Sequence, residues 1–143
     1  MIRPCDDKDI LEIFEIVNDA ATAYKGVIPV DQYGETYMPM EELRKQITEG
    51  VRFLGWEEGG RLEAVMGIQK SKDATLVRHA YVRTASRRKG LGGKLLQYLL
   101  GQADPPVLVG TWAAAQWAVR FYEKNGFVLV EEAEKNRLLR MYW

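Results

Sequence analysis

The chain has 143 residues, of which 47% are hydrophobic and 28% charged, and a formal net charge of +0. These values are ordinary for one soluble globular domain with its own core. A neutral chain argues against extended contact with nucleic acid or an anionic membrane surface, and no stretch approaches the about 20 apolar residues of a membrane span. Cys5 has no partner for a disulfide, and no signal peptide is recognisable. We therefore expect a single cytoplasmic domain over residues 1–143.

The first half of the sequence predicts two helices and the first strands of a sheet. Apolar residues recur at helical spacing over residues 10–24, after a capping aspartate, and again over residues 40–47. The strands expected in this half are residues 1–4, 51–56, 62–69 and 75–83. The last three follow one another through short glycine or polar turns, which favours an antiparallel meander.

An irregular loop is predicted between the two helices, over residues 24–39, because glycines and prolines interrupt it. The loop carries three tyrosines, Tyr24, Tyr33 and Tyr37. Two interpretations stay open: the aromatic side chains pack the loop over the core, or they are substrate-binding residues. The second interpretation rests on the frequent use of long loops as binding elements in compact domains.

The second half is organised around a basic, glycine-rich stretch, Arg87-Arg88-Lys89-Gly90-Leu91-Gly92-Gly93, which leads into a helix over residues 94–100. A glycine in a helix costs about 1 kcal/mol relative to alanine, and close approach to the backbone or a positive φ explains such a cost. Free amides at a helix start, beside basic side chains, indicate an anion site. Two common phosphate loops are excluded at Leu95, because a P-loop requires Ser or Thr there and a dinucleotide fingerprint requires glycine.

The remaining elements continue an alternation of strands and helices. A short apolar strand at residues 107–109 precedes a helix over residues 113–124, which Gly126 ends as its C-cap. Two final strands, at residues 127–130 and 137–143, are predicted to form a hairpin. The predicted order is therefore β-α-α-β-β-β-α-β-α-β-β.

Two signatures, together with this order, resemble the GCN5-related N-acetyltransferases (the GNAT superfamily). The first is Arg87-x-x-Gly90-x-Gly92, and the second is the stretch from Ala118 to Phe127, which matches A-x-x-x-Y-E-K-x-G-F. The resemblance implies an α+β fold with α/β/α layers, in which helices flank a mixed, mostly antiparallel sheet with splayed central parallel strands. Those parallel strands would be residues 75–83 and 107–109.

The resemblance also implies an activity and a cofactor. Members of the superfamily move the acetyl group of acetyl-CoA to an amine, which attacks directly in a ternary complex. The residues that would bind the cofactor, through main-chain groups and basic side chains, are Tyr81, Val82, Arg83, Arg87, Arg88, Lys89, Gly90, Leu91, Gly92 and Gly93. Tyr122 would protonate the departing thiolate, a modest task because a thiol has a pKa of about 8.5. The alternative is that Tyr122 packs in a site that uses water.

One position departs from the superfamily's pattern. An asparagine that often contacts the cofactor, seven residues before the tyrosine, is replaced here by Ala115. Thr111 and Gln116 are the nearby polar side chains that could take its place.

The group that accepts the proton of the attacking amine is left open. An alkyl amine with a pKa of about 10 is neutral in roughly one molecule in a thousand at pH 7, so a base is useful. His79, the only histidine, lies on the strand that would border the acetyl group, and catalytic, acceptor-binding and structural roles all stay open. The weaker candidates are Asp31, Glu35 and Glu63. No spacing of His, Cys, Asp and Glu indicates a metal site, and Cys5 has no nearby histidine that would activate it.

The acceptor is predicted to be a small-molecule amine, because the aromatic loop suggests an enclosed pocket. A protein N-terminus or a lysine is the alternative acceptor, and a non-catalytic acyl-CoA-binding module is the alternative function. A nucleic-acid binder that uses residues 83–94 is disfavoured by the neutral charge. The apolar residues 141–143 suggest a homodimer formed through a C-terminal strand.

Overall fold

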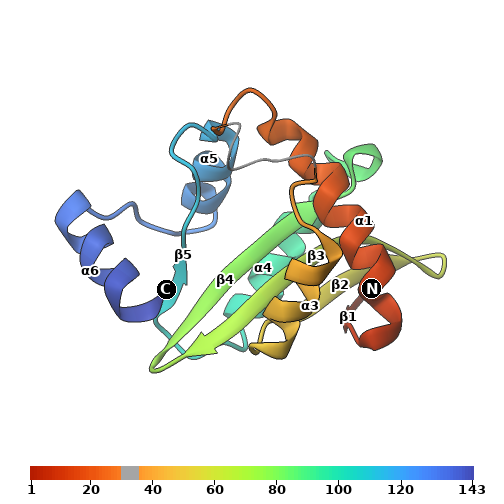
Figure 1. Cartoon of the computed structure of the whole chain (residues 1–143), viewed down its shortest axis with the longest axis horizontal. Coiled ribbons are helices and arrows are strands. Elements are labelled where there is room, and N and C mark those ends of the chain that lie inside the picture. Colours follow the sequence, from red (N-terminus) through yellow and green to blue (C-terminus); the bar gives the residue numbers. More distant parts are fainter. Residues whose placement is uncertain (30–35) are drawn as a thin grey trace.

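The computed structural model describes residues 1–29 and 36–143 and shows a five-stranded sheet with helices on both faces (Figure 1). The strands are β1 (Ile2–Pro4), β2 (Arg52–Glu58), β3 (Arg61–Ser71), β4 (Ala74–Val82) and β5 (Val107–Val109). The α-helices are α1 (Ile10–Ala20), α3 (Met40–Thr48), α4 (Leu91–Leu100), α5 (Gln116–Lys124) and α6 (Glu132–Tyr142). Short 3-10 helices lie at Asp7–Asp9, Ala21–Tyr24 and Thr84–Ser86. None of the helices described is long and apolar enough to cross a membrane.

The sheet is antiparallel except at its β5 side. Strands β1 to β4 pair in chain order as antiparallel neighbours, and β5 joins β4 in parallel. That parallel pairing joins residues 75–77 of β4 to residues 107–109 of β5 and goes no further. Residues 78–82 of β4 therefore have no strand beside them on that side within the described part of the chain. The predicted mixed sheet is confirmed, and the short pairing leaves an opening next to β4.

Two apolar cores lie on opposite faces of the sheet. Helices α1 and α3 cover one face, where Ile16 and Leu43 are fully buried together with residues of β2 and β3. Helix α4 covers the other face through the spacing of Leu91, Leu95 and Leu99, which places these side chains on one stripe. Burial of each such leucine stabilises the fold by about 2 kcal/mol. The predicted α/β/α layers are confirmed.

A β-bulge in β4 changes which side chains face which core. Gly67 of β3 pairs with His79 and Ile68 pairs with Val77, so Arg78 is an extra residue without a partner in the register. Strict alternation would place Val77 and His79 on the same face. With the bulge, Val77 packs in the α4 core, whereas His79 stacks on Phe53 of the α1–α3 core.

The two C-terminal strands predicted at residues 127–130 and 137–143 are wrong. Residues 127–130 form no regular element, and the following segment is helix α6. Its sequence favours a helix because it is rich in Glu, Lys, Leu, Arg and Met, and because Arg137 donates from Nε to Glu134 at 2.9 Å one turn away. Acidic residues in its first turn and Arg140 in its last suit the helix dipole. The strand on which the expected homodimer depended is therefore absent.

Candidate active site

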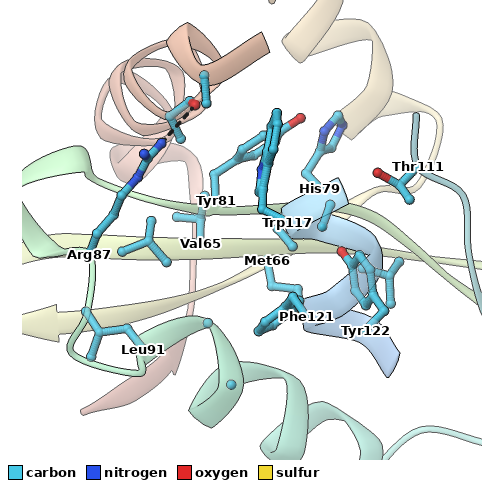
Figure 2. Close-up of a pocket in the computed structure, with 18 of the residues that line it drawn as sticks. Val65, Met66, His79, Tyr81, Arg87, Leu91, Thr111, Trp117, Phe121 and Tyr122 are labelled. Atoms are coloured by element: carbon cyan, nitrogen blue, oxygen red, sulfur yellow. Dashed lines mark hydrogen bonds between the residues drawn. The ribbon is translucent and has the colours of Figure 1, made fainter. Parts of the chain in front are cut away.

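A cavity of about 520 Å³ lies where β4 and β5 separate. Its walls come from the edge of β4 that has no described strand beside it, the start of α4, the segment after β5 and helix α5. The 3-10 helix Ala21–Tyr24 adds its last residues. Figure 2 shows Arg87 and Leu91 at one side of this cavity, His79, Thr111 and Tyr122 at the other, and Tyr81 and Trp117 between them. We call residues 86–93 the loop end of the cavity. The aromatic end comprises Tyr24, His79, Tyr81, Trp117 and Tyr122.

The loop end is built from backbone. Arg88 has a φ of 75° and Gly90 a φ of 73°, so two left-handed residues flank Lys89. This geometry costs a non-glycine residue such as Arg88 roughly 1–2 kcal/mol. Gly90 is the N-cap of α4, and the first helical bond runs from the Lys94 amide to the Gly90 carbonyl at 3.1 Å. The amides of residues 91–93 thus have no acceptor within the helix. They lie in the segment for which the sequence predicts an anion site.

The two glycines in the first turn of α4 are not required by packing within the protein. A Cβ at Gly92 would come no closer than 3.5 Å to its neighbours, Phe121 and Val82, and one at Gly93 would come no closer than 4.0 Å to Asn125. Both glycines line the cavity. The free space therefore lies on the cavity side, which suits close approach of a ligand to the backbone.

The basic residues predicted for the cofactor site divide into two groups. Arg87 and Arg88 line the cavity, and Arg87 also donates to the Ala20 carbonyl at 3.5 Å (Figure 2). Lys89 and Arg83 are not among the lining residues. Lys89 faces Glu58 at 4.0 Å.

Arg83 has a structural environment. Its side chain is buried, donates from Nε to the Leu62 carbonyl at 2.7 Å, and lies 3.5 Å from Glu12 and 3.6 Å from Glu15. Its amide donates to the Glu63 carbonyl at 2.9 Å. Arg83 thus joins the end of β4 to β3 and α1. Of the three strand residues predicted to bind the cofactor, Tyr81 and Val82 line the cavity and Arg83 does not.

Two carboxylates that the sequence does not single out as loop anchors hold the segment between β4 and α4. The Thr84 amide donates to Asp19 at 2.6 Å, and the Ser86 hydroxyl donates to Glu63 at 2.6 Å. Both contacts join residues more than 20 positions apart, so no local pattern reports them. Glu63, a weaker candidate base, is occupied by this contact. The other two, Asp31 and Glu35, lie outside the described residues.

Tyr122 lines the aromatic end of the cavity from α5. Its ring packs edge-on against Phe121 at 5.1 Å and Phe127 at 5.5 Å between ring centres. Burial raises the pKa of the phenol well above its ordinary value, so the hydroxyl stays protonated and acts as a donor. Of the two candidates for the missing asparagine, Thr111 lines the cavity and Gln116 does not.

His79 forms the far wall of the aromatic end. Its Nε2 lies 2.5 Å from Oε1 of Gln46 on α3, and its ring stacks on Phe53 at 5.8 Å. Burial, and to a smaller degree the charge of Arg78, lowers the pKa of His79 to about 4. The imidazole is therefore neutral at physiological pH.

Aromatic rings close the remaining wall. Tyr24 lies 5.5 Å from Tyr37 and 5.8 Å from Trp117 between ring centres, and the Tyr81 hydroxyl donates to the Tyr37 hydroxyl at 3.4 Å. Of the predicted substrate-binding tyrosines, Tyr24 lines the cavity and Tyr37 stands behind Tyr24 and Tyr81. Tyr33 lies outside the described residues. Trp117 is the aromatic wall residue whose place sequence reasoning could not assign.

The described lining residues include no Asp or Glu, and no group of three or more His, Cys, Asp or Glu residues in the described part of the chain could hold a metal ion. Cys5 lies outside the cavity, and burial raises its pKa to about 12. The thiol is therefore unreactive at neutral pH.

Comparisons with known proteins show the family of this chain. A family model described as "Acetyltransferase (GNAT) domain" matches residues 18–142. Peptidyl-lysine N-acetyltransferase YiaC of Escherichia coli (strain K12) is 27% identical over 88 residues, which are 62% of this chain and 58% of that protein. The chain thus matches just over half the length of this curated relative.

Solved structures share the fold. The PaiA N-acetyltransferase of Thermoplasma acidophilum, in complex with coenzyme A, superposes with a TM-score of 0.71 at 18% identity, covering 91% of this chain and 90% of that one. The smu.2055 protein of Streptococcus mutans UA159 superposes with a TM-score of 0.77 at 23% identity, covering 92% and 85%. The family model spans most of the sequence, and the chain therefore belongs to the GNAT family of acyl-CoA-dependent N-acetyltransferases.

Proposed function

We propose that this chain transfers the acetyl group of acetyl-CoA to an amine, which attacks directly in a ternary complex. One observation carries the proposal: a single cavity joins the unpaired amides at the start of α4, the free flank of β4, and the side chains of Tyr122 and His79. An anion site, a strand that can accept an extended chain, and a neutral polar site thus follow one another in one space.

The donor fits this order of features. The pyrophosphate of CoA would bind the amides of residues 91–93, with Arg87 and Arg88 adding charge. The pantetheine arm would lie along Tyr81 and Val82, where β4 lacks a neighbour on the β5 side. The thioester would then reach the space between β4 and Tyr122. That the PaiA structure holds coenzyme A supports the same assignment here.

Tyr122 would act on the leaving group. The amine nitrogen attacks the thioester carbonyl, a C–N bond forms, the C–S bond breaks, and the thiolate takes the phenolic proton of Tyr122. The proton lost by the amine leaves to solvent, and the phenolate of Tyr122 takes a proton from solvent, which restores the phenol. Burial raises the pKa of Tyr122, but the thiolate would form in the same dry space, where its own pKa is raised. The proton transfer therefore stays feasible.

The low pKa of His79 favours one of its candidate roles. Transfer of a proton from an ammonium of pKa about 10 to an imidazole of pKa about 4 would cost roughly 8 kcal/mol. Binding the neutral form of the amine costs only about 4 kcal/mol at pH 7, because one molecule in a thousand is already deprotonated. We therefore assign His79 to binding the amine through a hydrogen bond, and the base role is set aside.

We propose a small-molecule amine as the acceptor, because aromatic side chains enclose this end of the cavity. A peptide lysine is the second candidate, since the curated relative is a peptidyl-lysine N-acetyltransferase. We also place the reaction in the cytoplasm, where the free thiol of Cys5 is chemically suited.

Release of CoA thiol from acetyl-CoA tests the proposal when the chain is incubated with a panel of small amines, amino acids and lysine peptides. We expect turnover with at least one small amine and faster turnover than with the peptides. Faster turnover with a lysine peptide would assign the second candidate. Thermal stabilisation by acetyl-CoA without turnover on any member of the panel would instead favour a non-catalytic binding module.

A further inference from the structure

We propose that Gln46 is a positioning residue, which holds His79 in the tautomer protonated at Nε2 and so leaves Nδ1 free to accept a hydrogen bond from the acceptor amine. The assignment of the ligand rests on the proposed function. The assignment of the tautomer rests on contacts within the protein alone.

A chain of three side chains carries the argument. Gln46 donates from Nε2 to Oε1 of Glu42 at 3.2 Å, one helical turn earlier on α3. A carboxylate only accepts hydrogen bonds, so this contact fixes which end of the Gln46 amide faces Glu42. The amide oxygen must then face His79, 2.5 Å from its Nε2. Because an amide oxygen also only accepts, Nε2 carries the hydrogen and Nδ1 carries the lone pair.

The other ring nitrogen is left without a partner. Nδ1 of His79 is buried and has no hydrogen-bond partner in the described part of the chain. The residue lines the cavity, and 7% of its surface is exposed. A buried acceptor left unpaired costs about 1–3 kcal/mol. A ligand with an N–H group would recover that free energy, and a primary amine has such a group.

The ring cannot readily turn to satisfy itself. It stacks on Phe53 with an angle of 14° between the ring planes, and its Cδ2 lies 3.2 Å from the position that a Cβ on Gly67 would take. Gly67 thus lets the imidazole lie close against β3. With the stacked face on one side and Gln46 at Nε2, the orientation of Nδ1 is determined by packing.

Burial is the largest cause of the neutral imidazole, and the charged and titratable groups around the ring do not reverse it. From β4, Arg78 disfavours the imidazolium, and it donates to Gln69 at 2.8 Å. From α3, the charge of Glu42 opposes Arg78 and favours the imidazolium. Tyr81 lies beside the ring, Tyr37 lies beside Tyr81, and Tyr122 lies across the cavity. Burial raises the pKa of both Tyr81 and Tyr122, so neither adds a negative charge near neutral pH.

The tautomer is directly measurable, because His79 is the only histidine and its ring signals need no assignment. Nitrogen-15 NMR of the full chain at pH 7 should show a protonated Nε2 and an unprotonated Nδ1. Gln46→Glu should then raise the pKa of His79 by at least one unit, because a carboxylate stabilises the imidazolium. Thr48→Glu adds the same charge to an exposed position of α3 and should leave that pKa within a few tenths of a unit.

Activity provides the readout that a merely structural contact would not move. With an amine substrate, Gln46→Glu should lose kcat/KM as the pH falls through the raised pKa of His79, and Thr48→Glu should not. A protonated Nδ1 in the unmodified chain would overturn the proposal, even if Gln46→Glu did not fold. So would an equal rise of the pKa in both variants. If NMR shows the expected tautomer and no amine is acetylated, the proposed function fails and the positioning role of Gln46 stands.

Discussion

The two ends of the cavity are built in different ways. The loop end uses backbone groups of consecutive residues, 86–93, with left-handed backbone at Arg88 and Gly90. The aromatic end uses side chains from residues as far apart as Tyr24 and Tyr122. A backbone site depends little on side-chain identity beyond glycine, whereas a side-chain site changes with any of its members. The loop end therefore suits a constant donor, and the aromatic end suits an acceptor that differs between relatives.

Tyr122→Phe should have the largest effect, because this residue is the proposed proton donor to the leaving thiolate. The phenyl ring keeps its contacts with Phe121 and Phe127, so the fold and the KM for acetyl-CoA should change little. Loss of the proton donor should lower kcat by about 100-fold or more. Steady-state thiol release measures both constants. Tyr98→Phe, on the exposed surface of α4, is the matched control. Unchanged kcat in Tyr122→Phe would mean that the site uses water instead.

The aromatic end also predicts how stability depends on pH. The folded pKa of His79 is about 4, below its unfolded value of about 6.5, so the unfolded chain binds the extra proton between these values. Stability should therefore fall as the pH falls through this window. Between pH 7 and pH 5 we expect the free energy of unfolding to decrease by about 2 kcal/mol.

Urea unfolding at the two pH values measures this difference, and His79→Gln provides the control because glutamine does not titrate. As the only histidine in the chain, His79 is the only side chain with an ordinary pKa between pH 5 and pH 7. If the variant lost as much stability as the unmodified chain, the prediction that the buried imidazole is neutral would be wrong.

The contrast between the ends also explains what the sequence could predict. The loop end and Tyr122 lie in short local signatures, and their elements follow one another along the chain. Gln46 contacts His79, and Trp117 lines the cavity, only through the packing of α3 and α5, which leaves no local pattern. Strict alternation of side chains along a strand likewise does not predict the bulge at Arg78. At the C-terminus, the β-branched residues of 127–130 favoured a strand, but the helix-forming residues after them prevail in α6.

Gly90→Ala compares the loop end with an equivalent turn elsewhere. Gly90 has a φ of 73° and Gly26 a φ of 76°, and neither has a neighbouring protein atom within 4 Å of the position that a Cβ would take. Alanine should thus cost both sites about 1 kcal/mol of stability. Only Gly90→Ala should also weaken acetyl-CoA binding, by about tenfold, because a shift of the N-cap moves the free amides. Calorimetric titration measures the affinity, and equal weakening in Gly26→Ala would remove the loop end from the donor site.

Trp117→Ala should have the smallest effect and should separate the two ends most cleanly. Trp117 packs against Tyr24 at 5.8 Å between ring centres and is 41% exposed, so its loss should cost little stability. An aromatic contact of this kind contributes about 1 kcal/mol, so the KM for the amine should rise about fivefold while the KM for acetyl-CoA stays the same. Trp112→Ala, at an exposed position outside the cavity lining, should change neither constant. The KM that changes identifies the substrate that this ring contacts. A rise confined to the KM for acetyl-CoA would therefore place the donor, and not the acceptor, against Trp117.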